Sequence, residues 1–325
     1  MSDRCSVVDT TVEGFPAIAV ETGPLALTII PALGGKVSSL RDQRSGREWL
    51  WRHPRMAYRQ VPHGSSYVAE ADTGGWDECF PSVAACAYPS PPWAAAPIQD
   101  HGELWSQEAA LKVEASDERL AVHTTWQGIV LPYTFERTIS LTAGSAVLRC
   151  DYRVRNLSAA PLPFVWCIHP LIAIEPGMEL RFPPAARFNV GASRPSDLVG
   201  QTGGLTFPPP AQLAGRPLDL ARLPGPDAAL ALKLWSEPLA EGYASLHASD
   251  GAIHMRWDTA QLPQVALWMN LGAWAADSGV PYYNLGLEPC IGAQDSLADA
   301  VQLHNLFATV PPEGEYRWWL EIELS

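Results

Sequence analysis

Apolar and polar residues alternate along much of this chain. In the segments 133–141, 147–155 and 316–324, apolar side chains occupy every second position except 137, and mostly polar or charged side chains lie between them. This period of two is typical of antiparallel strands that bury one face and expose the other. The three segments are therefore predicted to be half-buried strands.

Short polar turn sequences at 116–118, 143–145 and 249–251 separate strand-like segments, as expected for hairpins. The best helix candidate, 296–307, is short. No repeat of 20–50 residues is visible, which disfavours a propeller. The pattern predicts an all-β protein, a large antiparallel β-sandwich with long loops, in which residues 1–325 form one domain.

The composition allows a large core and excludes several kinds of partner. Hydrophobic residues make up 47% of the chain and charged residues 18%, which disfavours disorder. The net charge is −13, from 22 basic and 35 acidic residues, and no basic run occurs. Nucleic acids and anionic membranes attract clustered positive charge, so neither is expected as a partner.

The six cysteines are spread along the chain without a C-x-x-C pair, which favours reduced thiols over zinc fingers or redox pairs. Residues 1–20 show no signal-peptide pattern, and no apolar run is long enough for a membrane helix. The chain is therefore predicted to be cytoplasmic. It also has 13 tryptophans, whose flat rings can stack on the apolar faces of sugars.

Two loop-like segments combine polar and aromatic residues. Trp76 and Asp77 follow a glycine pair in 74–81, and His101 lies between two carboxylates in 100–105. A neighbouring carboxylate favours the charged form of an imidazole. These residue types can also bind metals, but no second histidine lies at a ligand spacing, so no metal is predicted.

His169 and Glu288 each follow an apolar segment and precede a proline. Since proline ends hydrogen-bonded pairing and favours extended geometry before it, both residues are expected at strand ends. An unpaired carboxylate in such an apolar setting is costly. Glu288 is therefore a candidate functional residue, and His169 is either a second one or a buried structural histidine.

Together these segments resemble the aldose 1-epimerase (galactose mutarotase-like) family, from residues 29–35 to residues 287–289. His101 looks like the family's first active-site histidine, which helps to hold the sugar. His169 looks like the second histidine, the general acid, and Glu288 looks like the general base. The resemblance implies the galactose mutarotase-like supersandwich fold and exchange of the α and β anomers of a sugar.

In that reaction a base takes the proton of the C1 hydroxyl while an acid protonates the ring oxygen. The ring then opens and closes again on either face, with no metal or organic cofactor. The partner implied is a small-molecule sugar. Trp76, Trp105 and Trp268 are candidates for stacking on it, and Asp77 and Glu103 are candidates for accepting its hydroxyl protons.

The chain departs from well-known sugar mutarotases near His101. Asp100, Glu103 and Trp105 stand where those proteins typically carry asparagine and arginine, and no basic cluster for a phosphate is evident. The identity of the sugar stays open. Two other functions also stay open: a non-catalytic sugar-binding or sensing protein on the same fold, and a lyase or a glycosidase that uses Glu103 and Glu288 as paired carboxylates.

Overall fold

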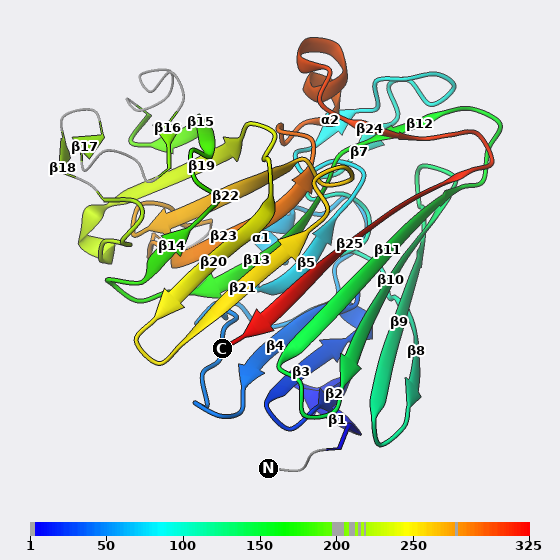
Figure 1. Ribbon diagram of the computed structural model, residues 1–325. Helices are drawn as coiled ribbons and strands as arrows, with labels where there is room; N and C mark the ends of the chain where they lie inside the picture. The colour runs from blue at the N-terminus through cyan, green and yellow to red at the C-terminus, as the bar shows by residue number, and fades with distance from the viewer. Residues whose placement is uncertain (1–3, 197–204, 208–211, 214–215, 218, 277–278) are drawn as a thin grey trace.

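The protein is built from two large antiparallel sheets that face each other, as the computed structural model shows (Figure 1). The structure describes residues 4–325 except 197–204, 208–211, 214–215, 218 and 277–278. This architecture confirms the predicted all-β sandwich. Within the described part of the chain, no helix is long and apolar enough to cross a membrane.

The larger sheet has eleven strands and carries His169, Lys233, Trp268 and Glu288, which belong to the site described below. It mixes N-terminal strands with strands from the second half of the chain, so residues far apart in sequence become neighbours. In spatial order, its strands are β1 (Ser6–Val12), β2 (Phe15–Glu21), β3 (Leu25–Ile30), β4 (Lys36–Asp42), β5 (Gly75–Cys79), β13 (Trp166–Ala173), β23 (Tyr283–Ile291), β22 (Gln264–Leu271), β19 (Leu230–Ser236), β15 (Arg187–Arg194) and β16 (Leu205–Thr206).

The second sheet has eight strands and includes the three strands predicted from alternation. Their apolar positions are buried and the positions between them are more exposed, which confirms the period-two interpretation. In spatial order, the strands are β14 (Glu179–Arg181), β20 (Gly242–Ala248), β21 (Gly251–Trp257), β25 (Glu315–Leu324), β11 (Val147–Asn156), β10 (Tyr133–Thr142), β9 (Arg119–Gln127) and β8 (Ala110–Ala115).

Small elements decorate the two sheets. The predicted helical segment 296–307 contains only a short turn of α-helix followed by a π-helical turn. The remaining elements are the strand pairs β6 (Cys86–Ala87) with β7 (Pro97–Ile98), β12 (Leu162–Phe164) with β24 (Ala308–Val310), and β17 (Gln212–Leu213) with β18 (Arg216–Pro217), and the helical turns η1 (Pro31–Leu33), α1 (Tyr67–Glu70), η3 (Pro226–Ala228), α2 (Leu297–Asp299) and η4 (Ala300–His304).

The core between the sheets contains a buried ion pair among many aromatic rings. Arg137 of β10 donates to Glu78 of β5 at 3.0 Å, and both side chains are almost fully buried. Trp76, Trp166 and Tyr152 also donate to the Glu78 carboxylate. Because these donors satisfy the carboxylate, its charge is tolerated in the interior.

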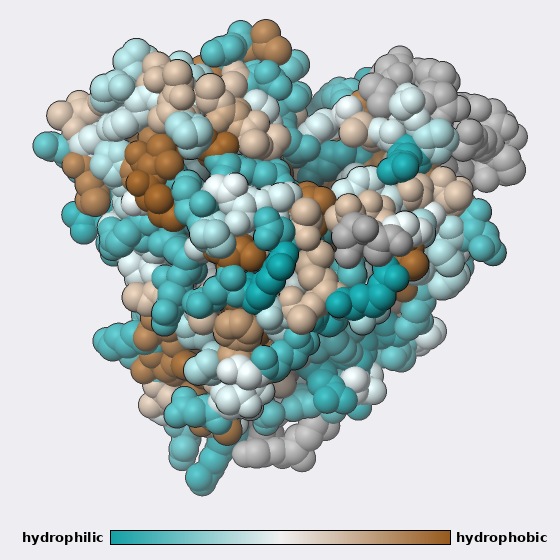
Figure 2. Space-filling view, turned by 180° about the vertical axis from the view of Figure 1, so that it is seen from behind, coloured by the Kyte–Doolittle hydropathy of each residue, from teal (hydrophilic) through white to brown (hydrophobic). Residues whose placement is uncertain are grey.

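The space-filling view from behind shows small separate apolar areas among polar ones on that face (Figure 2). Exposed large apolar side chains in the described part of the chain are scattered singly, as is normal for a protein surface. They are Val8, Ile129, Leu157, Val280 and Leu303.

Candidate active site

His169 and Glu288 meet on the outer face of the eleven-stranded sheet. They lie on the neighbouring strands β13 and β23, whose register places them opposite each other. His169 Nδ1 and Glu288 Oε1 are 2.6 Å apart. The sheet therefore joins two residues that are 119 positions apart along the chain.

The expectation that both residues end their strands is wrong. Both strands continue through Pro170 and Pro289, so His169 and Glu288 lie inside them. Pairing between β13 and β23 is interrupted only between residues 167 and 171. Each proline lacks an N–H group for the ladder, which accounts for a local gap in pairing, while the rest of each strand remains bonded to its neighbours.

Lys233 of β19 is the second partner of Glu288, and sequence reasoning missed it. Its Nζ lies 2.5 Å from Glu288 Oε2 and 3.6 Å from Asp295 Oδ1. Burial would raise the pKa of Glu288, but Lys233 and His169 together lower it to about 2. The carboxylate is therefore ionised at neutral pH. A lysine inside the apolar strand 230–236 was the available clue.

An ionised carboxylate can only accept a hydrogen bond, so the proton in the contact between His169 and Glu288 belongs to His169 Nδ1. In a neutral imidazole this leaves Nε2 unprotonated and able to accept a proton. Glu288 itself is fully buried, whereas His169 is 7% exposed and lines a cavity. The imidazole is thus the member of this pair that a ligand can touch.

His101 brings a second imidazole to the same cavity. Its ring centre lies 5.2 Å from that of His169, and it stacks on Tyr67 at 4.0 Å. Burial opposes the charged form, but Asp100, whose Oδ1 is 3.0 Å from His101 Nδ1, raises the pKa of His101 above its usual value. The next residue, Gly102, has a φ of +74°, and an added Cβ would lie 2.0 Å from the Phe80 carbonyl oxygen.

The cavity has a volume of about 230 Å³. His169, His101 and Lys233 line it together with the carboxylates of Asp72, Asp100 and Asp295. Asp72 is 6% exposed, and its Oδ1 has no hydrogen-bond partner. A buried acceptor of this kind is costly unless a ligand satisfies it. Sequence reasoning missed Asp72, which follows a short helix without any recognisable motif.

Among the predicted sugar contacts, Trp268 lines this cavity. It projects from β22 beside Lys233 and forms an edge-to-face pair with Trp274, with ring centres 5.6 Å apart. Both indoles are only partly buried. They give the cavity an aromatic wall.

The structure does not bring the other four predicted contacts to the cavity. Trp76 points into the sandwich interior, and Asp77 on the opposite face is held by Lys36 and Tyr67. Glu103 accepts hydrogen bonds from the amides of residues 129 and 130 and from a tyrosine hydroxyl. Trp105 is 5% exposed and donates to the Asp100 backbone. Successive residues of a strand point to opposite faces of the sheet, which separates Trp76 from Asp77. Hydrogen bonds to nearby groups satisfy Glu103 and Trp105.

One group of described residues has metal-ligand chemistry. Ligand atoms of Cys79, His101 and His169 all lie within 4.8 Å of one another. Tetrahedral zinc with bonds of about 2.0–2.3 Å brings its donor atoms to roughly 3.6 Å from each other. Burial raises the pKa of the Cys79 thiol well above its usual value, which disfavours the thiolate that zinc binds. The absence of a metal stays a prediction.

Comparison with solved structures identifies the fold. A galactose mutarotase-like protein from Clostridium acetobutylicum aligns over 99% of both chains, with a TM-score of 0.69 and 13% identity. One from Lactobacillus casei aligns over 95% of this chain and 100% of its own, with a TM-score of 0.65 and 16% identity. A galactose mutarotase related enzyme from Lactobacillus acidophilus aligns over 95% and 97%, with a TM-score of 0.64 and 14% identity.

No family model matches the sequence, and no curated protein matches it. At these identities the structural likeness establishes the fold alone. The fold confirms the predicted galactose mutarotase-like sandwich, and the chemistry has to be argued from the site.

Proposed function

We propose that this protein binds a free aldose and interconverts its α and β anomers by general acid–base catalysis. The observation that carries the proposal is the contact between His169 and Glu288, at a cavity that a second imidazole also lines. The likeness to galactose mutarotase-like folds supports the same reaction class.

The geometry favours a division of roles that differs from the one the family resemblance implies. Direct base catalysis by Glu288 would require its sealed carboxylate to reach the C1 hydroxyl. In our proposal His169 Nε2 takes that proton, and the carboxylate stabilises the imidazolium that forms. Glu288 then acts as the charge partner of the base.

His101 supplies the acid in this scheme. Its raised pKa keeps more of it in the charged form near neutral pH. It donates its proton to the ring oxygen as the bond between C1 and that oxygen breaks, giving the open-chain aldehyde. Rotation about the C1–C2 bond and reversal of both proton transfers give the other anomer. The two oxygens involved are bonded to the same carbon, which suits two imidazoles that face one small cavity.

The direct test is the optical rotation of freshly dissolved pure anomers, screened over a panel of aldoses. Wild type is expected to accelerate the approach to equilibrium. His169→Ala and Glu288→Gln should each lose about 10²–10⁴-fold in rate, as expected for a positioned acid or base. His304→Ala, at an exposed histidine, is the matched control. Inactivity of wild type on every aldose, or a full rate in Glu288→Gln, refutes the proposal.

A non-catalytic sugar-binding protein is the second candidate. It is favoured by one observation: Glu288 is fully engaged by Lys233 and His169, an arrangement that can also be purely structural. This alternative predicts saturable sugar binding by calorimetry without any change in the rate of anomer exchange. The glycosidase alternative has less support, because Glu103 does not line the cavity and is held by local donors.

A further inference from the structure

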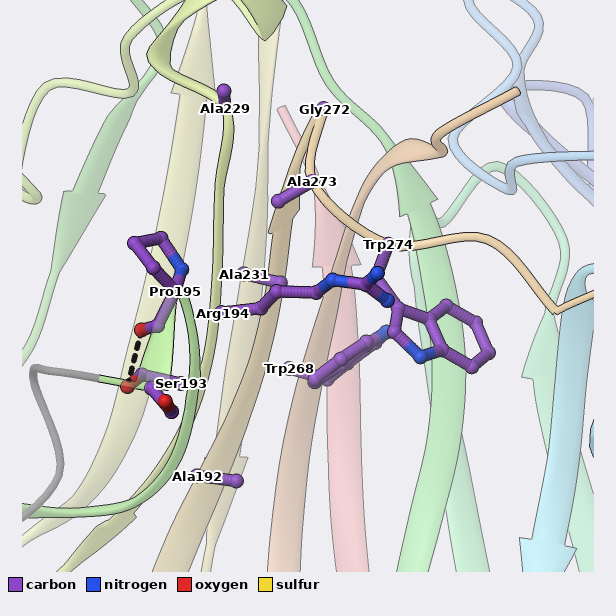
Figure 3. A pocket seen from close by; sticks show the side chains of 11 residues that line it. Ala192, Ser193, Arg194, Pro195, Ala229, Ala231, Trp268, Gly272, Ala273 and Trp274 are labelled. Carbon is purple, nitrogen blue, oxygen red and sulfur yellow. Dashed lines mark hydrogen bonds between the residues drawn. The ribbon is translucent and has the colours of Figure 1, made fainter. Parts of the chain in front are cut away.

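A second, larger pocket opens beside the cavity of His169. It has a volume of about 800 Å³ and lies over β15, β19, β22 and the loop that follows β22 (Figure 3). Ala192, Trp268 and Trp274 line both spaces. A ligand in the cavity can therefore extend into the second pocket past the two indoles.

Small side chains form much of the wall of this pocket. Ala229, Ala231, Gly272 and Ala273 leave the space beside Trp274 open. An indole face next to an open floor can stack on the apolar face of a sugar ring. The pocket thus has room and an aromatic surface for a flat, partly apolar group.

Arg194 supplies hydrogen-bond donors to the same pocket. It stands at the end of β15 and is exposed. Figure 3 shows its side chain reaching across the pocket towards Trp274. No described residue forms an ion pair with its guanidinium, which carries five N–H donors. These donors suit neighbouring hydroxyl groups on one edge of a sugar.

The electrostatics favour a neutral ligand over an anionic one. Asp72, Asp100 and Asp295 line the adjoining cavity, and Lys233 is already paired with Glu288. An acidic group on the ring in this cavity would therefore meet more carboxylates than cations, even with His101 charged, and the chain as a whole has a net charge of −13. Hydroxyl groups meet no such repulsion.

We infer that the substrate is a reducing disaccharide or a longer oligosaccharide. Resting on the proposed function, this inference places the reducing-end ring in the cavity of His169. The next ring lies in the second pocket, against Trp274, with Arg194 donating to its hydroxyls. The second pocket then sets the substrate class and takes no part in the proton transfers.

The test compares glucose with maltose, cellobiose and lactose, which share a reducing glucose, and with glucose 6-phosphate. For wild type, kcat/KM for anomer exchange is expected to be at least tenfold higher for one of the disaccharides than for glucose. Arg194→Ala and the pocket-filling Ala273→Leu should each remove this advantage. Arg187→Ala is the matched control, because Arg187 is an exposed arginine on the same strand that does not line the pocket.

Two failures are distinguishable. Equal kcat/KM for glucose and every disaccharide, with no effect of Arg194→Ala, overturns the inference and leaves anomer exchange standing. A preference for glucose 6-phosphate also overturns it, because an anion would then be the favoured ligand.

Absence of exchange with every sugar refutes the proposed function. The inference about the second pocket is then tested by calorimetry alone. Disaccharide binding at least tenfold tighter than glucose binding, and lost in Arg194→Ala, supports the inference. Equal affinities overturn it.

Discussion

The ion pair between Lys233 and Glu288 makes a sharp prediction for Glu288→Gln. The glutamine is neutral, so among the described residues the buried ammonium keeps only Asp295, at 3.6 Å and partly exposed, as a charged partner. Removing one partner of a buried pair costs about 3–5 kcal/mol because the other charge remains in the interior. Asp295 compensates part of this, so we expect the lower end of the range.

The loss of stability converts into a shift of the unfolding temperature. An unfolding entropy of about 2.1 cal/mol/K per residue over 325 residues gives roughly 0.7 kcal/mol/K. A loss of about 3–5 kcal/mol therefore lowers Tm by roughly 4–7 °C. Differential scanning calorimetry resolves a shift of this size.

A second substitution separates stability from chemistry. Lys233→Met in the Glu288→Gln background removes the stranded charge and replaces it with an apolar side chain of similar length. The double variant should regain most of the lost Tm, while anomer exchange stays about 10²–10⁴-fold below wild type because His169 still lacks its carboxylate. An unchanged Tm in Glu288→Gln, or a double variant no more stable than the single one, would refute the reasoning.

Four further predictions follow from the site. The carboxylate of Asp100 raises the pKa of His101 against the effect of burial. The charged His101, which is the acid, is lost as pH rises through this pKa. Asp100→Asn should therefore move the alkaline limb of the kcat/KM profile to lower pH. Asp72→Ala should raise KM about 10-fold with little change in kcat, since it removes an unpartnered oxygen that is available to a sugar hydroxyl. Gly286→Ala should lower stability by about 1–3 kcal/mol in urea unfolding, because the added Cβ would lie 2.7 Å from Glu288 Oε1. Wild type should lose the stability contributed by Glu288 as pH falls from 4.5 to about 2, since the pKa of Glu288 in the folded protein lies below the ordinary value. An acid titration followed by circular dichroism should show this loss in wild type and not in Glu288→Gln.

The sequence predicted three strands of the eight-stranded sheet for a physical reason. β10, β11 and β25 bury one face, so their apolar residues alternate. β13 and β23 are buried almost throughout, and their composition carries no alternation. In those two strands the prolines looked like strand ends, and only the register shows that pairing resumes beyond them.

His101, His169 and Glu288 could be proposed from sequence because each stands out locally. Lys233 does not, because its role depends on the order of β13, β23, β22 and β19 in the sheet. That order has no local signature. Trp76 and Glu103 show the opposite case: both stand in segments that were expected to be polar, aromatic loops. For Trp76 this is wrong, because it lies in the buried strand β5, and partners inside the protein satisfy both residues.

The position of Lys233 explains how a carboxylate with a pKa of about 2 can serve a base. Such a carboxylate holds a proton weakly, so it would be a poor base for a sugar hydroxyl. The same property keeps the shared proton on His169 Nδ1, and therefore keeps Nε2 free to accept one. The ammonium, the carboxylate and the imidazole then form one chain in which the buried charges fix the tautomer of the residue that faces the cavity. A carboxylate with its ordinary pKa would compete more strongly for that proton and weaken the preference for this tautomer.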